Sequence, residues 1–136
     1  MELLSEATGE TTGTAVIVGR TVPNSIRNVW NVLLTAEGSE ALLGPGAQLG
    51  NKGETWQSHD GREGVVRSFH PFEQIRFSWR LNQDCAPSMV AVNLRSEGTD
   101  ATRIEIQHSN LPESANRERV EDRWSAALER IESECL

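Results

Sequence analysis

The chain has 136 residues, with 13 Lys and Arg against 20 Asp and Glu, and its formal net charge at pH 7 is −7. This length fits one domain with a single core, and the negative charge disfavours a surface that binds nucleic-acid phosphates. The apolar runs are too short to cross a bilayer, and the opening "MELLSEATGETTG" lacks the basic start and apolar stretch of a signal peptide. We therefore expect a cytoplasmic protein that binds neither nucleic acid nor a membrane.

Motifs for metals, cofactors and hydrolysis are missing from the sequence. Cys85 and Cys135 are too few for a disulfide framework and have no CxxC spacing. The glycines between positions 44 and 53 match neither the GxGxxG nor the GxxxxGK[ST] nucleotide-binding loop. No serine lies in a GxSxG elbow. We expect no metal site and no cofactor.

The first strand is predicted at 15–22, where β-branched residues alternate. Residues 1–13 are rich in Glu, Thr and Gly without any period, which predicts a poorly ordered tail before a single domain at 14–136. The inward face of this strand carries Arg20 in addition to its valines.

A short amphipathic helix is predicted at 26–34, because its apolar residues recur at i, i+3, i+4 and i+7. Asn24 or Ser25 offers its N-cap. A second brief helix can begin at Thr35, and the glycine-rich stretch at 44–53 predicts a loop.

Five further strands are predicted as hairpins. Turn-forming clusters at 59–61, 70–73 and 98–100 separate segments of period two. The clearest is 74–81, which alternates apolar and polar residues as a half-buried antiparallel strand does. The inward residues predicted for this strand are Ile75, Phe77, Trp79 and Leu81. Those predicted for the last strand are Thr102, Ile104, Ile106 and His108.

A long C-terminal helix is predicted after Pro112, where apolar residues recur at intervals of three and four. Its opposite face is charged and expected to be solvated, with Arg123 among its residues. An antiparallel sheet and a helix that each have one apolar face must pack on each other, so the fold class is α+β. A twisted sheet around such a helix leaves a concave apolar space suited to a small ligand.

Four segments together resemble the SRPBCC, or START-like, superfamily, in the branch similar to the C-terminal domain of the activator of the ninety-kilodalton heat-shock-protein ATPase. They are "GRTVPNSIRNVWNVLLTAEG", "LLGPGA", "DGREGVVRSFHPFEQIRFSWR" and "ATRIEIQHSNLPESANRERVEDRWSAALERIE". The resemblance implies a helix-grip fold, in which a six-stranded curved antiparallel sheet wraps around the long C-terminal helix, with one or two short helices between the first two strands. The family often has glycine where this chain has Arg123, a long cation beside Trp124.

Candidate cavity residues are the inward apolar positions of the predicted sheet and helices. Two of the candidates are polar: His108 could contact a ligand or be a hydrogen-bonded core histidine, and Arg20 could hold a carboxylate of a ligand or pair with an acidic residue. The cavity candidates are Trp30, Leu33, Trp56, Phe69, Phe77, Trp79, Val92, Ile104, Ile106, His108, Trp124 and Leu128.

The leading hypothesis for function is a non-catalytic module that binds a small hydrophobic or amphipathic molecule between sheet and helix, as a monomer or homodimer. The resemblance implies two alternatives. One is a polyketide cyclase-like or aromatase-like enzyme that uses the same cavity, and the other is a co-chaperone-like protein that contacts a chaperone.

Overall fold

The computed structural model describes residues 15–82, 84–112 and 115–136, so the predicted tail at 1–13 lies outside the described residues. The strands are β1 (Val16–Val22), β2 (Thr55–Gln57), β3 (Glu63–His70), β4 (Gln74–Trp79), β5 (Ser88–Ser96) and β6 (Thr102–Ser109). The helices are α1 (Ile26–Leu33), α2 (Ala36–Leu43) and α3 (Arg117–Arg130), and a π-helical turn, Ile131–Cys135, continues α3.

The strands form one six-stranded antiparallel sheet in the order β1-β6-β5-β4-β3-β2. From β2 to β6, strands that follow one another in the chain are neighbours in the sheet. β1 pairs with β6, so β1 and β2 are the two edge strands. In the β5–β6 register, Val90 lies opposite His108 and Val92 lies opposite Ile106. This register places the apolar residues of both strands on the same face of the sheet.

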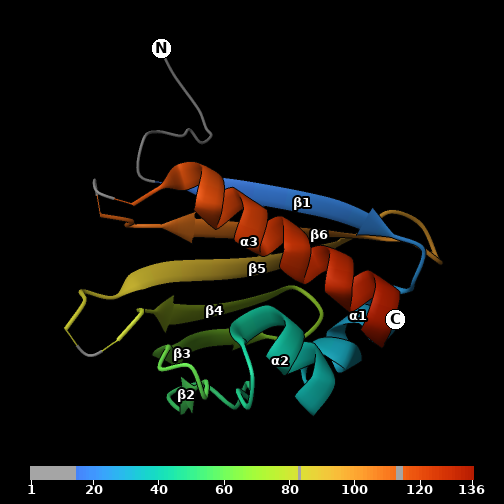
Figure 1. The fold of residues 1–136 in the computed structure, drawn as a ribbon. Coiled ribbons are helices and arrows are strands. Elements are labelled where there is room, and N and C mark those ends of the chain that lie inside the picture. Colours follow the sequence, from blue (N-terminus) through green and yellow to red (C-terminus); the bar gives the residue numbers. More distant parts are fainter. Residues whose placement is uncertain (1–14, 83, 113–114) are drawn as a thin grey trace.

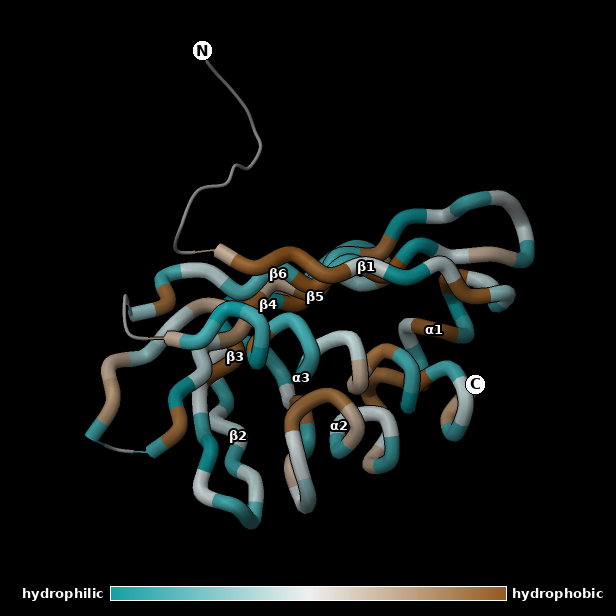
Figure 2. The backbone as a smooth tube through the Cα atoms, turned by 45° about the horizontal axis from the view of Figure 1, so that its top comes forward, coloured by the Kyte–Doolittle hydropathy of each residue, from teal (hydrophilic) through white to brown (hydrophobic). Residues whose placement is uncertain are grey.

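All three helices lie on one side of the sheet (Figures 1 and 2), with α3 running across it and α1 and α2 packed together beside the C-terminal end of α3. Side-chain caps fix where the helices begin. Ser25 accepts a hydrogen bond from the Asn28 amide, Thr35 accepts one from Gly38, and Asn116 accepts one from Arg119. The predicted α+β helix-grip fold is confirmed.

The core fills the space between sheet and helices. Trp124 and Leu128 of α3 are almost fully buried, as are Ile104 and Ile106 of β6. Figure 2 shows hydrophobic stretches in β1, α1 and α2. The core therefore fixes α3 along the sheet.

Candidate functional site

A pocket of about 610 Å³ opens where the end of β4 and the loop after it face the first turns of α3. We call it the β4–α3 pocket. Ligand pockets in proteins commonly measure about 300–1,000 Å³ and are mostly apolar. Its lining is Trp79, Arg80, Leu81, Cys85, Ala86, Ser88, Leu111, Pro112, Ala115, Asn116, Arg119, Val120 and Arg123.

Trp79 forms the inner wall of the pocket because it is the last inward residue of β4. Ile75 and Phe77 alternate with it and are fully buried. The prediction that Leu81 continues this series is wrong, because Leu81 is 56% exposed. The strand ends at Trp79, and Arg80 makes an isolated bridge to Glu63, so the inward alternation stops and Leu81 lies at the rim of the pocket.

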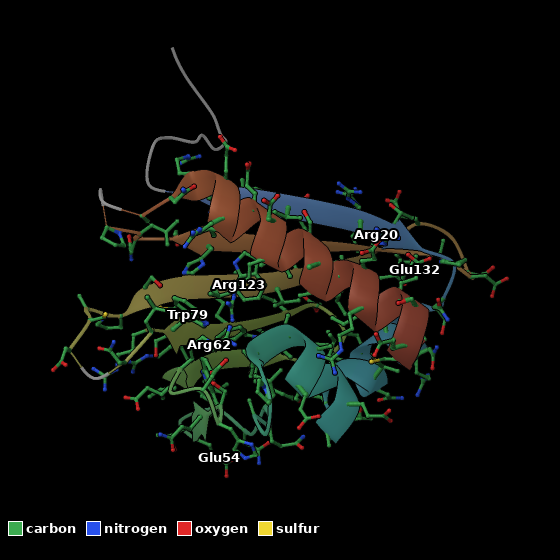
Figure 3. The ribbon with its side chains drawn as sticks, viewed as in Figure 1. Arg20, Glu54, Arg62, Trp79, Arg123 and Glu132 are labelled. Carbon is green, nitrogen blue, oxygen red and sulfur yellow. The ribbon has the colours of Figure 1, made fainter. Side chains whose placement is uncertain are left out.

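Arg123 crosses the pocket from the helix side, which corrects the prediction that it belongs to the solvated face of α3. Its guanidinium lies 5.2 Å from the ring centre of Trp79 and 5.7 Å from that of Trp124. Figure 3 shows Arg123 and Trp79 in the space between α3 and the sheet. Because Arg123 precedes the buried Trp124, it borders the buried stripe, and its long side chain reaches the end of β4.

Two N–H donors in this wall have no hydrogen-bond partner among the described residues. They are the buried Nε of Arg123 and the buried Nε1 of Trp79. Buried donors are nearly always paired in folded proteins, with protein groups, water or a ligand. Both atoms lie beneath the surface of the pocket wall, so they are features of the wall and not groups offered to the open space.

His108 lies behind the pocket and is 1% exposed. Trp124 Nε1 donates to its Nδ1 at 3.1 Å, so Nδ1 carries no proton. Its Nε2 lies 2.6 Å from Ser88 Oγ, which itself donates to the Trp79 carbonyl at 2.9 Å. Nε2 therefore carries the proton and donates to Ser88, so the imidazole cannot accept the Ser88 proton as a catalytic base would.

Burial without a charged partner lowers the pKa of His108 from 6.5 to about 4, because desolvation disfavours the imidazolium. The ring is thus neutral at pH 7, with both nitrogens paired inside the protein. This geometry is that of the hydrogen-bonded core histidine considered in the sequence analysis.

Arg20, the other polar candidate, pairs with an acidic residue. Its Nε donates to Glu132 Oε1 at 2.5 Å, joining β1 to the π-helical turn after α3. Arg20 is absent from the lining of the β4–α3 pocket.

We expect Arg20→Met to change stability little. The two side chains are 41% and 28% exposed, so solvent screens the ion pair. The loss in the free energy of unfolding should stay below about 1 kcal/mol, measured by urea unfolding at pH 7. A loss above about 2 kcal/mol would instead indicate a desolvated, tightly coupled pair.

The remaining candidate residues lie in or against the core. Ring contacts lock several of them together, including Trp30 with Phe69 at 5.2 Å and Trp56 with Phe77 at 5.9 Å. Only Trp79 of the predicted cavity set lines the β4–α3 pocket, and the other side chains fill much of the space that the sequence analysis assigned to a ligand. Those in the core cluster are Trp30, Leu33, Trp56, Phe77, Val92, Ile104, Ile106, Trp124 and Leu128, with Phe69 packed against it.

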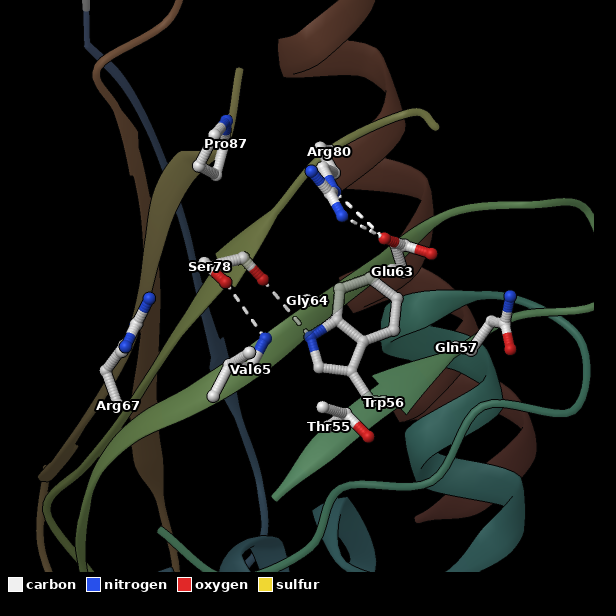
Figure 4. Close-up of a pocket in the computed structure, with 10 residues that line it drawn as sticks. All are labelled: Thr55, Trp56, Gln57, Glu63, Gly64, Val65, Arg67, Ser78, Arg80 and Pro87. Carbon is white, nitrogen blue, oxygen red and sulfur yellow. Dashed lines mark hydrogen bonds and ion pairs between the residues drawn. The ribbon is translucent and has the colours of Figure 1, made fainter. Parts of the chain in front are cut away.

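A second depression, of about 460 Å³, lies at β2, β3 and the end of β4 (Figure 4). Its polar groups largely satisfy one another: Arg80 pairs with Glu63, and Ser78 Oγ accepts from the Val65 amide. Trp56 Nε1 donates to the Ser78 carbonyl at 3.1 Å. A side chain at Gly64 would have its Cβ 1.8 Å from that carbonyl oxygen, so glycine allows this close packing. These contacts hold β2 on the sheet and leave few groups for a ligand.

Sequence reasoning missed most of the pocket lining. Leu111, Ala115 and Asn116 lie in the link between β6 and α3 or at the cap of α3, where no periodicity reveals an inward direction. Arg123 carried a usable signal, a cation beside a buried tryptophan of the helix. In the described part of the chain, no three His, Cys, Asp or Glu residues gather as a metal site, and no helix is both long and apolar enough to span a membrane.

Comparison with known proteins identifies the family. The family described as "Activator of Hsp90 ATPase homolog 1-like protein" matches residues 21–135, most of the chain. The chain belongs to this family. The match confirms the resemblance to the activator branch of the SRPBCC superfamily. No curated protein matches the chain.

Solved structures share the fold at low sequence identity. An HSP90 activator from Plasmodium falciparum is 20% identical with a TM-score of 0.75, covering 88% of this chain and 94% of its own. The Aha1 dimer from Colwellia psychrerythraea is 14% identical with a TM-score of 0.74, covering 90% and 96%. DynU16, a putative protein in the dynemicin biosynthetic locus, is 16% identical with a TM-score of 0.70, covering 90% of this chain and 48% of its own.

Proposed function

We propose that this domain binds a small amphipathic molecule in the β4–α3 pocket. The observation that carries the proposal is a pocket of about 610 Å³ that combines a mostly apolar lining with the cationic side chains of Arg119 and Arg123. Leu81, Leu111, Pro112 and Val120 supply apolar surface, and the core beneath them gives the pocket a rigid floor. A preformed apolar pocket with a few convergent polar groups is the usual form of a small-molecule site.

Binding is favoured over a cyclase-like or aromatase-like reaction in the same pocket. The described lining contains no carboxylate and no imidazole. His108, the nearest histidine behind it, holds the tautomer that cannot deprotonate Ser88. A reaction there would have to proceed without a carboxylate or an imidazole as acid or base, and to rely largely on positioning.

The proposal is tested with N-phenyl-1-naphthylamine, an uncharged dye that fluoresces when it enters an apolar site. We expect saturable binding to the wild-type protein. Leu81→Ser should weaken dye affinity about fivefold, because it removes about 1 kcal/mol of apolar contact at the rim. Ile17→Ser is the matched control, since Ile17 is also an exposed apolar residue, at 45%, and lies on β1 away from the pocket.

Two outcomes would contradict the proposal. One is the absence of saturable dye binding to the folded wild-type protein. The other is equal weakening by Leu81→Ser and Ile17→Ser, which would place the dye on the general surface.

A chaperone contact in the cytoplasm is the second candidate function, because the family is described by activation of Hsp90 ATPase and one neighbour is an HSP90 activator. The test is the steady-state ATPase rate of the host's Hsp90 with and without micromolar protein. A rate increase, together with co-elution in size-exclusion chromatography, would support it. An unchanged rate without co-elution would contradict it. The same chromatography distinguishes monomer from homodimer.

A further inference from the structure

We infer that the ligand of the β4–α3 pocket carries an anionic group, a carboxylate in the simplest case, which Arg123 binds beside the ring of Trp79. This inference rests on the proposed function and specifies the chemical class of the ligand. It begins from a cation that lines an otherwise mostly apolar pocket and lies over the ring of Trp79.

Arg123 is a permanent positive charge in an incompletely balanced site. Its guanidinium stacks between the rings of Trp79 and Trp124 at 5.2 and 5.7 Å from their centres. These cation–π contacts offset part of the loss of hydration. Within the described part of the chain, Arg123 has no ion pair with a carboxylate and no acceptor for its buried Nε. Arg123 is half-buried and lines the pocket, so a ligand there can supply the anionic partner that a partly desolvated charge favours.

Trp79 supplies a fixed apolar surface beside this cation. Its ring is held against Arg123 on one side, and its centre lies 5.2 Å from that of the His108 ring. The Nε1 of Trp79 is buried beneath the pocket surface, so it is not offered to a ligand. The charge on Arg123 therefore sets the polar preference of this wall and favours a ligand group that is negative.

The other charged side chains that line the pocket are also positive. Arg119 lies one helical turn before Arg123 and also lines the pocket, as does Asn116, the N-cap of α3. The positive end of the helix dipole is therefore directed at the same space. The described lining contains no acidic residue, although the chain as a whole carries a net charge of −7. With Leu81, Leu111 and Val120 on the other walls, the pocket suits an apolar body with one anionic head.

The experiment compares two competitors that differ only in the head group: naphthalene-1-acetate and its neutral amide, naphthalene-1-acetamide. Each displaces N-phenyl-1-naphthylamine from the wild-type protein at pH 7. We expect the carboxylate to displace the dye at concentrations at least tenfold lower than the amide, as expected for a charge-assisted hydrogen bond. Arg123→Met should abolish this preference, because methionine preserves the apolar stem of the side chain and removes the charged group. The dye affinity of the variant is measured separately and scales its displacement curves.

Two controls separate charge at this site from general effects. Arg130→Met removes a cation from the same helix, but Arg130 pairs with the exposed Glu134 and lies outside the β4–α3 pocket, so the preference should remain. Trp79→Phe keeps an aromatic ring beside Arg123 but is smaller and lacks the buried N–H, so it should weaken binding of the carboxylate and of the amide to a similar extent. The urea midpoint of each variant shows that it is folded.

The outcomes separate this inference from the proposed function. A tenfold carboxylate preference that Arg123→Met removes and Arg130→Met retains supports the inference. Equal displacement by carboxylate and amide overturns the anionic ligand while dye binding still supports the pocket. An unchanged preference in Arg123→Met overturns the assignment of the anionic group to Arg123. Failure of the dye and both competitors to bind the folded wild-type protein overturns the proposed function and this inference together.

Discussion

Replacing Trp124 with alanine is expected to lower the free energy of unfolding by about 3–5 kcal/mol. Trp124 is fully buried in the middle of the sheet-facing side of α3, where its ring fills the space against β6. Alanine leaves a cavity there and also removes the hydrogen bond from Trp124 Nε1 to His108 Nδ1. Urea unfolding at pH 7, with an unchanged dependence on denaturant, measures the loss.

Two variants divide this effect into its parts. Trp124→Phe retains most of the ring volume but leaves the buried His108 Nδ1 without a donor, so we expect a smaller loss of about 1–3 kcal/mol. Leu81→Ser changes an apolar residue that is 56% exposed and should cost less than about 0.5 kcal/mol. An unfolding midpoint for Trp124→Ala close to that of Leu81→Ser would mean that the helix does not depend on this ring.

The fold could be predicted because a half-buried sheet and an amphipathic helix have different periods. In β6 the burial alternates without interruption from Thr102 to His108, as the sequence pattern indicates. In α3, Trp124 and Leu128 are separated by one turn and share the buried face. Each pattern specifies its own element, and a sheet and a helix that each have one apolar face can bury both faces only against each other.

The site could not be predicted to the same extent, because it lies where these periods end. Leu81 follows the alternation of β4 in sequence, but the strand has already ended and the residue faces solvent. Arg123 has the composition of a surface residue, and only the position of the β4 end beneath α3 makes it a pocket residue. Neither the end of a strand nor the reach of a long side chain is encoded in hydrophobic periodicity.

How far the cavity extends between sheet and helix could not be predicted from the sequence either. The alternation of side chains along a strand identifies which of them point between sheet and helix. It does not show whether these side chains meet and fill the space. Here the T-shaped contacts of His108 with Trp79 and Trp124, at 5.2 and 5.8 Å, close the interior just behind the pocket. Such contacts depend on ring orientation and sheet curvature, which are properties of the assembled fold.

Acidification is expected to destabilise the protein through His108. Its pKa is about 4 in the folded protein and 6.5 in the absence of burial. Between these values the unfolded chain binds a proton at this residue and the folded protein does not, so lowering the pH favours unfolding. The stability that His108 contributes is fully present above pH 6.5 and is lost as the pH falls to 4. At about 1.4 kcal/mol per pH unit, the total is about 3 kcal/mol.

The variant His108→Gln isolates this effect from the titration of the carboxylates. Glutamine cannot satisfy both Ser88 and Trp124, so the variant should be less stable than wild type at pH 7. Because glutamine does not titrate, the difference in unfolding free energy should shrink as urea unfolding is repeated from pH 7 to pH 4.5. His70→Gln, at an exposed histidine, should keep the pH dependence of the wild type. A difference between wild type and His108→Gln that stays constant over this range would contradict a buried, neutral His108.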